Sequence, residues 1–434
     1  MGTGAYTIIL FGGLLLMLFL GINIFTALGF VGIVVILMVR GLNGLVMVGT
    51  TTYSVVTDIT FMAIPFFVLM GNLLVHSGIS DRLFTALNRW LHKLKGSLAV
   101  ISMLVCIVLA MCSGFTPGFV TMALIAVPAM LQRNYNKHLA IGSVMAGGIL
   151  GDVIPPSLML IVIGSVTRVS IGKLFMGAFI PGFLCAGVYI SYILIRCYLQ
   201  PEMAGSVVEE KYTWHERWES LREVILPLLL VIAVLGAILF GIATPSEAAA
   251  VGAFGAMLCC LLYRKFTYEV ISESCKETLL ITGMALWIIL TATFFGQVYT
   301  SAGAQKMILN IIGNLEVNRW LVILAMQIIL FILGMVLDDI AIITICAPIF
   351  MPIAVLLGFS PIWFGVLFVL NMQMAYMSPP FGWCLIMMKA LAPPEIKMED
   401  IWVSSLPFLG MQALVLLLVM FFPVLALWLP EMMV

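Results

Sequence analysis

Charged residues are scarce in this chain of 434 residues. Asp, Glu, Lys and Arg together make up 9% of it, whereas 63% of the residues are hydrophobic. A soluble globular domain carries about 25% charged residues. Apolar runs long enough to cross a hydrocarbon core of about 30 Å recur along the chain. The composition therefore excludes a soluble globular protein and predicts an all-α polytopic membrane protein.

Motifs for catalysis and for cofactor binding are also missing. The sequence has no Cys-x-x-Cys pair, and its four histidines share no short motif with its nine cysteines. This argues against a disulfide framework, a zinc site and a haem. There is no Gly-x-x-x-x-Gly-Lys-Ser/Thr loop, no His-Glu-x-x-His and no Gly-x-Ser-x-Gly. We therefore expect neither direct ATP hydrolysis nor enzyme activity, and no organic cofactor.

The apolar runs predict ten single spans and two longer segments of another kind. The segments 97–131 and 319–354 are interrupted by small or polar residues, so each is either two tight crossings or a re-entrant hairpin. We favour hairpins, because non-helical backbone is tolerated at membrane depth where it is buried in protein or faces a watery cavity. An amphipathic arm precedes each hairpin, at 80–95 and 304–314. The single spans are 5–20, 23–39, 56–77, 138–166, 171–197, 223–241, 246–264, 279–300, 361–389 and 403–429.

The two halves of the chain share a series of landmarks in the same order. Five matches at nearly one offset indicate an internal repeat. The number of crossings between equivalent landmarks is odd whether a hairpin counts as none or as two, so the repeats are predicted to be inverted. The equivalent landmarks lie 220 to 225 residues apart: Gly71 and Gly296, Gly78 and Gly303, Gly114 and Gly334, Pro128 and Pro348, and Pro155-Pro156 and Pro379-Pro380.

Basic residues predict the orientation in the membrane. With the N-terminus outside, 15 of the 20 basic residues fall on the cytoplasmic side, which is the bias expected from the positive-inside rule. The first hairpin then opens from the cytoplasm and the second from the outside. The basic residues left outside are Arg40, Arg168, Lys173, Lys306 and Arg319.

The stretch Gly151-Asp-Val-Ile-Pro-Pro-Ser-Leu-Met-Leu160 places two prolines in the middle of the 138–166 span. Proline removes a backbone donor and clashes with the preceding turn, so the helix must break here. Unwound carbonyls suit a bare cation, and the N-terminus of a half-helix suits an anion. A simple structural kink is the alternative for one double proline. Because the second half of the chain repeats the break at Pro379-Pro380, we favour a binding site at both breaks.

Polar residues near the hairpin tips complete the candidate site. Ser113, Gly114 and Thr116 offer hydroxyls and close backbone approach in the first hairpin, and Gly334 offers close approach in the second. Asp338 is an intramembrane carboxylate, which makes it a functional candidate. Capping of the following half-helix is an equally good explanation for it, and the same holds for two further acids. Those acids are Asp152 and Asp339.

Two further segments have structural explanations. Thr244-Pro245-Ser246-Glu247 matches a capping box, with Thr at the N-cap and Glu at the third helical position, so we assign Glu247 no role toward a substrate. The charged segment 198–222 is predicted to be a solvated connector between the halves.

Together these motifs resemble the large membrane (M, DctM-like) subunit of tripartite ATP-independent periplasmic (TRAP) transporters, which belong to the ion-transporter superfamily. The resemblance covers nearly the whole chain, and the motifs appear in the family's order. They are Ile64-Pro-Phe-Phe-Val-Leu-Met-Gly-Asn72, Ser113-Gly114, Gly151-x-x-Ile-Pro-Pro-Ser157, Ser170-Ile-Gly-Lys-Leu-Phe175 with Pro181-Gly182, Gly241-Ile-Ala-Thr-Pro-Ser-Glu-Ala-Ala249, Gly334-Met-Val-Leu-Asp338 and Ser378-Pro-Pro-Phe-Gly382.

The resemblance implies a sodium-coupled importer of the elevator type, in which a transport domain moves against a fixed scaffold. The scaffold would comprise 1–96, with the first arm, and 198–314, with the second. The transport domain would comprise 97–197, with hairpin 97–131 and broken helix 138–166, and 315–434, with hairpin 319–354 and broken helix 361–389. The implied partners are a small four-helix membrane subunit and a periplasmic substrate-binding protein, and the implied location is the bacterial inner membrane.

The resemblance also implies two sodium sites, each built from a hairpin tip and a broken helix. Ala375 stands where the family usually has glycine and Ser378 where it usually has threonine, and the first tip reads Ser-Gly-Phe-Thr in place of Ser-Gly-Ser. Thr116, Ser157 and Asp338 are possible substrate or tip contacts. Sodium site 1 would use Ser113, Gly114, Gly151, Ile154 and Pro156, and site 2 would use Gly334, Ala375, Ser378 and Phe381.

The expected function is the import of a small organic acid with sodium. A stand-alone ion-coupled carboxylate carrier of the same superfamily is the nearest alternative. A channel or a membrane enzyme is the alternative from another class.

Overall fold

The computed structural model describes residues 3–113, 115–205, 212–314 and 317–433, and these residues form helices and no β-strand. The α-helices are α1 (Thr3–Phe19), α2 (Ile24–Arg40), α3 (Val46–Val56), α4 (Ala63–His76), α5 (Ile79–Leu91), α6 (Ser97–Ser113), α7 (Phe115–Gln132), α8 (Lys137–Ile149), α9 (Leu158–Thr167), α10 (Ile171–Leu199), α11 (Trp214–Leu239), α12 (Pro245–Leu262), α13 (Tyr268–Ser301), α14 (Ala304–Asn314), α15 (Arg319–Gly334), α16 (Asp339–Leu356), α17 (Pro361–Tyr376), α18 (Trp383–Leu391), α19 (Met398–Phe421) and α20 (Val424–Glu431). Short 3₁₀ turns, η1 (Gly41–Leu45), η2 (Ile59–Met62), η3 (Leu150–Asp152) and η4 (Pro201–Met203), join some of them.

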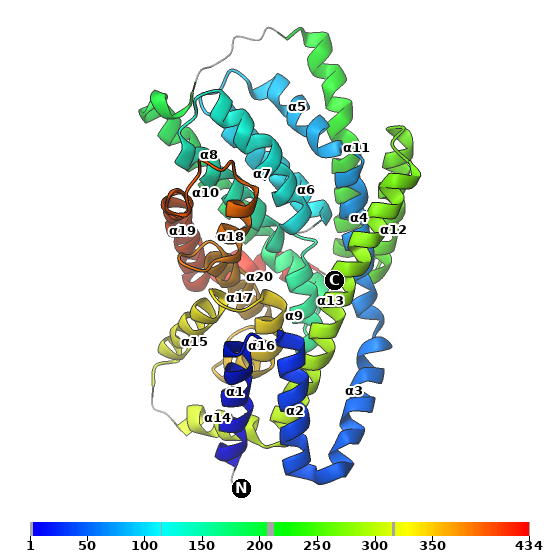
Figure 1. The fold of residues 1–434 in the computed structure, drawn as a ribbon, viewed down its shortest axis with the longest axis vertical. Helices are drawn as coiled ribbons and strands as arrows, with labels where there is room; N and C mark the ends of the chain where they lie inside the picture. Colours follow the sequence, from blue (N-terminus) through cyan, green and yellow to red (C-terminus); the bar gives the residue numbers. More distant parts are fainter. Residues whose placement is uncertain (1–2, 114, 206–211, 315–316, 434) are drawn as a thin grey trace.

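The molecule is elongated. Helices α1 and α14 lie at one end of its long axis, and α5 and the start of α11 lie at the other (Figure 1). In the described part of the chain, eight helical segments are long and apolar enough to cross a membrane. Apolar side chains such as Phe19, Tyr268 and Leu279 are exposed on the outside, as expected where lipid is the solvent. The prediction of an all-α, multi-pass membrane protein is confirmed.

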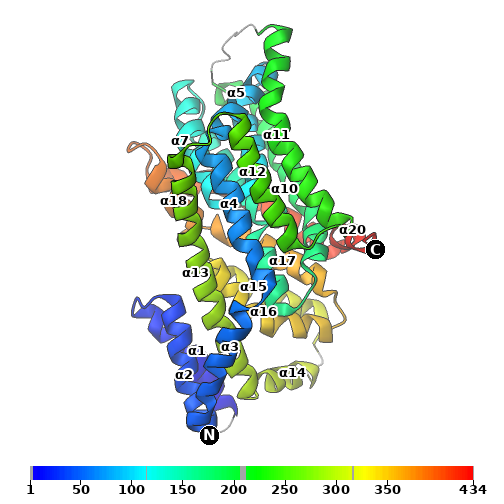
Figure 2. The same cartoon turned by 90° about the vertical axis from the view of Figure 1, so that its right-hand side faces the viewer.

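One group of helices is built around two long rods: α13 forms one, and α3 together with α4 forms the other. Helix α13 runs beside α3 and α4 along much of the long axis (Figure 2). Hydrogen bonds join the rods toward both ends: the Thr51 hydroxyl donates to Gln297 Oε1 at 2.5 Å in a partly buried contact, and Asn72 Nδ2 donates to the Thr278 hydroxyl at 3.1 Å in a buried one. Gly32 of α2 allows a close approach to α13, because a Cβ there would lie 2.7 Å from the ring of Phe294.

A second group contains the two segments predicted as hairpins. Segment 97–131 forms the adjacent helices α6 and α7, and segment 319–354 forms α15 and α16. Helices α6 and α7 press against α8 through two glycines: a Cβ on Gly147 would meet Cys106, and one on Gly148 would meet the ring of Phe119. Helix α15 approaches α17 in the same way at Gly334. Each helix pair is therefore packed against a helix that ends a few residues before a double proline.

Amphipathic patterns and capping residues in the sequence predicted several helices correctly. The arm predicted at 304–314 is α14, and the arm predicted at 80–95 is α5, which ends earlier, at Leu91. Thr244 and Glu247 form the predicted capping box: the Thr hydroxyl accepts from the Glu backbone N–H at 3.4 Å, and Glu Oε2 accepts from the Thr backbone N–H at 2.8 Å.

Other boundaries were wrong. Residues 46–56 form α3, which was not predicted. The helix tolerates Thr50 and Thr52 because each hydroxyl donates to a backbone carbonyl of the preceding turn. The span 403–429 is two helices, α19 and α20, because the residue before Pro423 is held out of the helical region. The connector 198–222 is shorter than expected, since a capping box at Thr213 starts α11 at residue 214.

Candidate functional site

The first double proline interrupts the predicted span 138–166. Helix α8 ends at Ile149, the turn η3 follows, and α9 begins at Leu158. The N–H groups of Val153 and Ile154 both donate to the carbonyl of Leu150, at 3.2 and 2.8 Å. Pro155 has no N–H, so the carbonyl of Gly151 loses the donor that a continuous helix would supply. Residues 149–157 are all buried.

Ser157 organises the far side of this break. Its hydroxyl donates to the carbonyl of Asp152, which replaces the donor lost at Pro156. The same oxygen accepts from the N–H of Leu160 at 3.4 Å and caps α9. Ser157 therefore acts as a structural element of the break, and its side chain is fully buried.

The second double proline produces a break of similar construction. Helix α17 ends at Tyr376 and α18 begins at Trp383. The Ser378 N–H donates to the carbonyl of Ala375, and the Gly382 N–H donates to the carbonyl of Ser378, both at 3.0 Å. Gly382 is required for this turn, because a Cβ there would clash with the backbone oxygens of Tyr376 and Ser378. Both double prolines contain a cis peptide bond.

Three acids lie at or near the two breaks: Asp152 is buried, Asp339 is partly buried and Asp338 is exposed. Asp152 is 7% exposed, and its Oδ2 has no hydrogen-bond partner among the described residues. Asp338 occupies the N-cap position of α16, and Asp339 follows it in the first turn. The Asp339 backbone N–H donates to the Tyr376 hydroxyl at 3.1 Å, which ties the start of α16 to the end of α17. Asp338 and Asp339 therefore lie beside the second break, and Asp152 lies within the first.

The structure brings some of the predicted site residues together. In site 2, Gly334 and Ala375 touch: a Cβ on the glycine would lie 2.6 Å from the Ala375 Cβ. Ser378 is buried in the same break, and the side chain of Phe381 is 60% exposed. In site 1, Gly151, Ile154 and Pro156 share the first break. Gly114 and the side chains of Ser113 and Thr116 lie outside the described residues.

The chemistry of the breaks fits a hard cation. Within the described residues no group of three His, Cys, Asp or Glu side chains is placed to hold a metal ion. The breaks instead offer backbone carbonyls that have lost helical donors, such as that of Gly151, and one unpaired buried carboxylate oxygen on Asp152. Oxygen ligands of this kind match sodium in discontinuous membrane helices.

A buried chain of amides connects the breaks, and the sequence analysis missed it. Gln373 of α17 donates through Nε2 to the carbonyl of Ile149. Gln412 of α19 donates to Gln373 Oε1 at 2.7 Å, and the Tyr189 hydroxyl of α10 donates to Gln412 Oε1 at 2.5 Å. All three side chains are fully buried. The only available signal was a pair of glutamines inside otherwise apolar runs.

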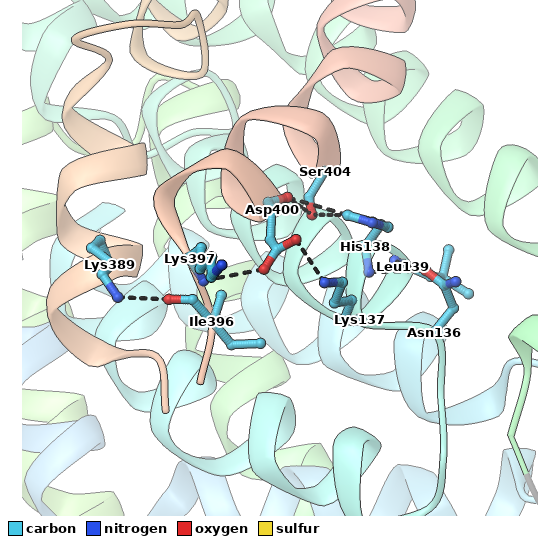
Figure 3. Close-up of polar contacts among 9 residues, drawn as sticks. All are labelled: Asn136, Lys137, His138, Leu139, Lys389, Ile396, Lys397, Asp400 and Ser404. Atoms are coloured by element: carbon cyan, nitrogen blue, oxygen red, sulfur yellow. Dashed lines mark hydrogen bonds and ion pairs between the residues drawn. The ribbon is translucent and has the colours of Figure 1, made fainter. Parts of the chain in front are cut away.

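A polar cluster fastens α8 to α19 at their starts (Figure 3). Lys137 Nζ lies 2.6 Å from Asp400 Oδ1, and the His138 ring nitrogen Nδ1 lies 3.2 Å from both the Asp400 carbonyl and the Ser404 hydroxyl. Nearby, Lys389 at the end of α18 donates to the carbonyl of Ile396 at 2.6 Å. The first broken helix is thus joined to the C-terminal helices at a second place.

A cavity of about 490 Å³ lies between the two groups of helices. Its wall includes Arg40, Asp58 and Arg168, with hydroxyl and amide side chains from α3, α9 and α13. Asp58 and Arg168 form an ion pair at 3.6 Å, in which the arginine is 78% exposed. Arg168 adopts a left-handed backbone conformation, with φ of 61°, directly after α9. This ion pair spans the boundary between the groups.

Solved structures of similar shape are membrane transporters. The fold aligns with the YdaH transporter of Alcanivorax borkumensis at a TM-score of 0.60 and 16% identity, over 89% of this chain and 88% of that one. It aligns with Neisseria gonorrhoeae MtrF, from a class of antimetabolite efflux pumps, at 0.62 and 13% identity, over 90% and 85%. At these identities the likeness concerns the fold alone.

Curated relatives share more of the sequence. The chain is 32% identical to the C4-dicarboxylate TRAP transporter large permease protein DctM of Pseudomonas aeruginosa, over 86% of both chains. It is 28% identical to the sialic acid TRAP transporter large permease protein SiaM of Vibrio cholerae, over 97% of both. It is 30% identical to the isethionate TRAP transporter permease protein DctMQ of Oleidesulfovibrio alaskensis, over 96% of this chain and 65% of that protein.

These relatives are named as transporter permeases, which confirms the prediction of a transporter subunit in place of an enzyme. Residues 11–425 match the model of a protein family described as "Tripartite ATP-independent periplasmic transporter, DctM component". The chain therefore belongs to the DctM family of TRAP transporter large permease subunits.

Proposed function

We propose that this chain imports a small organic acid together with sodium, by moving a transport domain against a scaffold. The observation that carries the proposal is the pair of double-proline breaks, each packed against its own helix pair. Backbone freed by such a break suits a cation at mid-membrane. Because the two breaks occur in equivalent places of the two halves, we propose one sodium site at each.

The hydrogen bonds support a division into two bodies. In the proposed scaffold, 1–96 and 198–314, Thr51 and Asn72 bond to residues of α13 from the other half of the sequence. In the proposed transport domain, 97–197 and 315–434, Gln373 and Lys137 make contacts between distant segments in the same way. Each body is therefore fastened internally across the two halves of the chain. Across the boundary, α13 packs against α16, and α4 and α5 pack against α6. The cavity also lies there, together with the ion pair between Asp58 and Arg168, whose arginine is largely exposed, so that the pair contributes about 0–1 kcal/mol. A boundary of this kind is compatible with sliding.

We further propose that the repeats are inverted, that α6–α7 and α15–α16 are re-entrant hairpins opening to opposite sides, and that the N-terminus is periplasmic in a bacterial inner membrane. The distribution of basic residues supports the orientation. Sodium site 1 would use Ser113, Gly114, Gly151, Ile154 and Pro156, and site 2 would use Gly334, Ala375, Ser378 and Phe381.

The names of the relatives support an acidic solute and further subunits. C4-dicarboxylates, sialic acid and isethionate are all organic acids. The chain spans 65% of the relative named DctMQ, so that protein has length for an additional membrane part. We propose that a separate small membrane subunit supplies this part here, and that a periplasmic binding protein delivers the solute.

Uptake into proteoliposomes tests this function. The large and small subunits are reconstituted together, the binding protein is added outside, and radiolabelled C4-dicarboxylate, isethionate and sialic acid are offered in turn. An inward sodium gradient is expected to drive accumulation of one of these acids, and an equal choline gradient is not. Equal uptake in sodium and in choline would contradict sodium coupling. Uptake by the large subunit alone would favour the stand-alone carrier.

A further inference from the structure

Gln373 joins the second broken helix to the backbone of the first break through a side-chain hydrogen bond. Its amide nitrogen donates to the carbonyl of Ile149, the last residue of α8. In a continuous helix that carbonyl would accept from Val153, whose N–H instead turns to Leu150. A hydrogen bond such as the one from Gln373 stabilises the folded state by about 0.5–1.5 kcal/mol. Gln373 therefore holds the end of α8 in its broken form.

The position of Gln373 also joins the two proposed sodium sites. Gly151 of site 1 lies two residues beyond the carbonyl that Gln373 holds, and Ala375 of site 2 lies two residues beyond Gln373 itself. The glutamine side chain has little freedom, because Gln412 donates to its Oε1 at 2.7 Å and Tyr189 holds Gln412 in turn. A displacement at either break is therefore passed to the other through a fixed amide.

The contact between Gln373 and Ile149 joins two equivalent positions of the proposed repeats. Gln373 and Ile149 are 224 residues apart, which is also the separation of Pro379 from Pro155. Gln373 thus bonds to the backbone of its own counterpart in the other half, as residues on the axis relating two repeats would. Only one side-chain hydrogen bond forms between the two positions, because Gln373 has a polar side chain and its counterpart Ile149 has an apolar one.

From this geometry we infer that Gln373 is a positioning residue that couples the two sodium sites, so that filling one site favours filling the other. The inference rests on the proposed sodium sites. Coupling of this kind is a free energy shared by both sites and is therefore reciprocal. Removing the amide is expected to leave two sites that fill independently, each more weakly.

Sodium-dependent thermal stability tests the coupling without a solute. Purified protein is melted over a range of NaCl concentrations, with choline chloride added to constant ionic strength, because a ligand that binds only the folded state raises its stability by mass action. The unmodified protein is expected to show a steep dependence, with a Hill coefficient well above 1. Gln373→Met is expected to lower the coefficient toward 1 and to raise the half-saturating sodium about 5- to 10-fold.

Asn371→Leu is the matched control. Asn371 is buried on the same helix, and it donates to the carbonyl and to Oε1 of Gln327, at 2.8 and 2.6 Å. Its bonds stay within the second half of the chain, so its loss is expected to lower the melting temperature and leave the Hill coefficient unchanged. Tyr189→Phe, which loosens the amide chain from its far end, is expected to lower the coefficient partly and serves if Gln373→Met does not fold.

The outcomes separate the inference from the function. If sodium stabilises the unmodified protein no more than choline does, the proposed sodium sites fail. If sodium stabilises it cooperatively and both Gln373→Met and Tyr189→Phe keep the full Hill coefficient, the sites stand and the coupling role of Gln373 is overturned. A fall in the coefficient for Asn371→Leu equal to that for Gln373→Met would also overturn it.

Discussion

Adding one methyl group at Gly334 is expected to damage the proposed sodium site 2, and a second substitution is expected to restore it. The Cβ of Gly334→Ala would lie 2.6 Å from the Cβ of Ala375, about 1 Å inside ordinary carbon–carbon contact. Because both atoms are fixed to helix backbones, α15 and α17 must separate. Overpacking of this kind costs roughly 1–3 kcal/mol. The next neighbour, Met372 Cε at 3.1 Å, ends a flexible side chain and is able to move away.

The separation also displaces the backbone of Ala375, so sodium binding should weaken together with stability. A displacement that costs the site about 1.4 kcal/mol corresponds to a tenfold increase in half-saturating sodium. Thermal melting at increasing sodium measures both quantities in one experiment. Gly410→Ala is the matched control, because it lies inside α19 and nothing lies within 4 Å of its added Cβ. It is expected to be neutral or slightly stabilising, as Ala is favoured over Gly in a helix by about 1 kcal/mol.

A second substitution gives the decisive result. In Gly334→Ala/Ala375→Gly the clashing methyl group is removed from the other helix, so the double variant is expected to regain most of the stability and sodium affinity. Ala375→Gly alone should cost about 1 kcal/mol through the helix propensity of glycine. The reasoning is refuted if Gly334→Ala behaves like Gly410→Ala, or if the double variant is no better than Gly334→Ala.

Three further changes have distinct expected outcomes. Gly382→Ala should prevent accumulation of folded protein, as seen by size-exclusion chromatography, because its neighbours are backbone oxygens that cannot move aside; normal yield would contradict the assigned turn. Asp58→Asn should leave the melting temperature unchanged, since its partner Arg168 is largely exposed, yet alter the uptake rate up to about fivefold; an unchanged rate would argue that the ion pair plays no part in movement. Lys137→Met should lower the melting temperature in 0.05 M salt by an amount that shrinks in 1 M salt; a salt-independent loss would point to packing.

The breaks and caps were predictable because their causes are local. Pro155 and Pro379 each break the helix because the proline ring lacks an N–H and clashes with the preceding turn. The capping box at Thr244 depends on four consecutive residues only. The start of α11 could have been found in the same way, since Thr213 and Glu216 have the same spacing.

The contacts between the halves were not predictable, because their partners are far apart in sequence. Gln373 and Ile149 are separated by 224 residues, and only the folded chain shows that the glutamine reaches a carbonyl and not lipid. The ion pair of Lys137 with Asp400 likewise joins residues from opposite halves, and each residue alone looks like an ordinary interfacial charge. A polar side chain within an apolar run predicts that it has a polar partner, but the sequence does not identify which residue that partner is.

Movement between the two proposed bodies is the claim that the account depends on most. It is tested by electron-spin distance measurements in nanodiscs, on a background in which the exposed Cys275 is replaced by serine. One label pair joins exposed Leu280 of α13 to exposed Val403 of α19, and the control pair joins Leu280 to Val251 of α12. The account predicts that sodium and the transported acid shift the first distance between two populations and leave the second unchanged. One fixed distance for the first pair in every condition, in protein that transports, would contradict it.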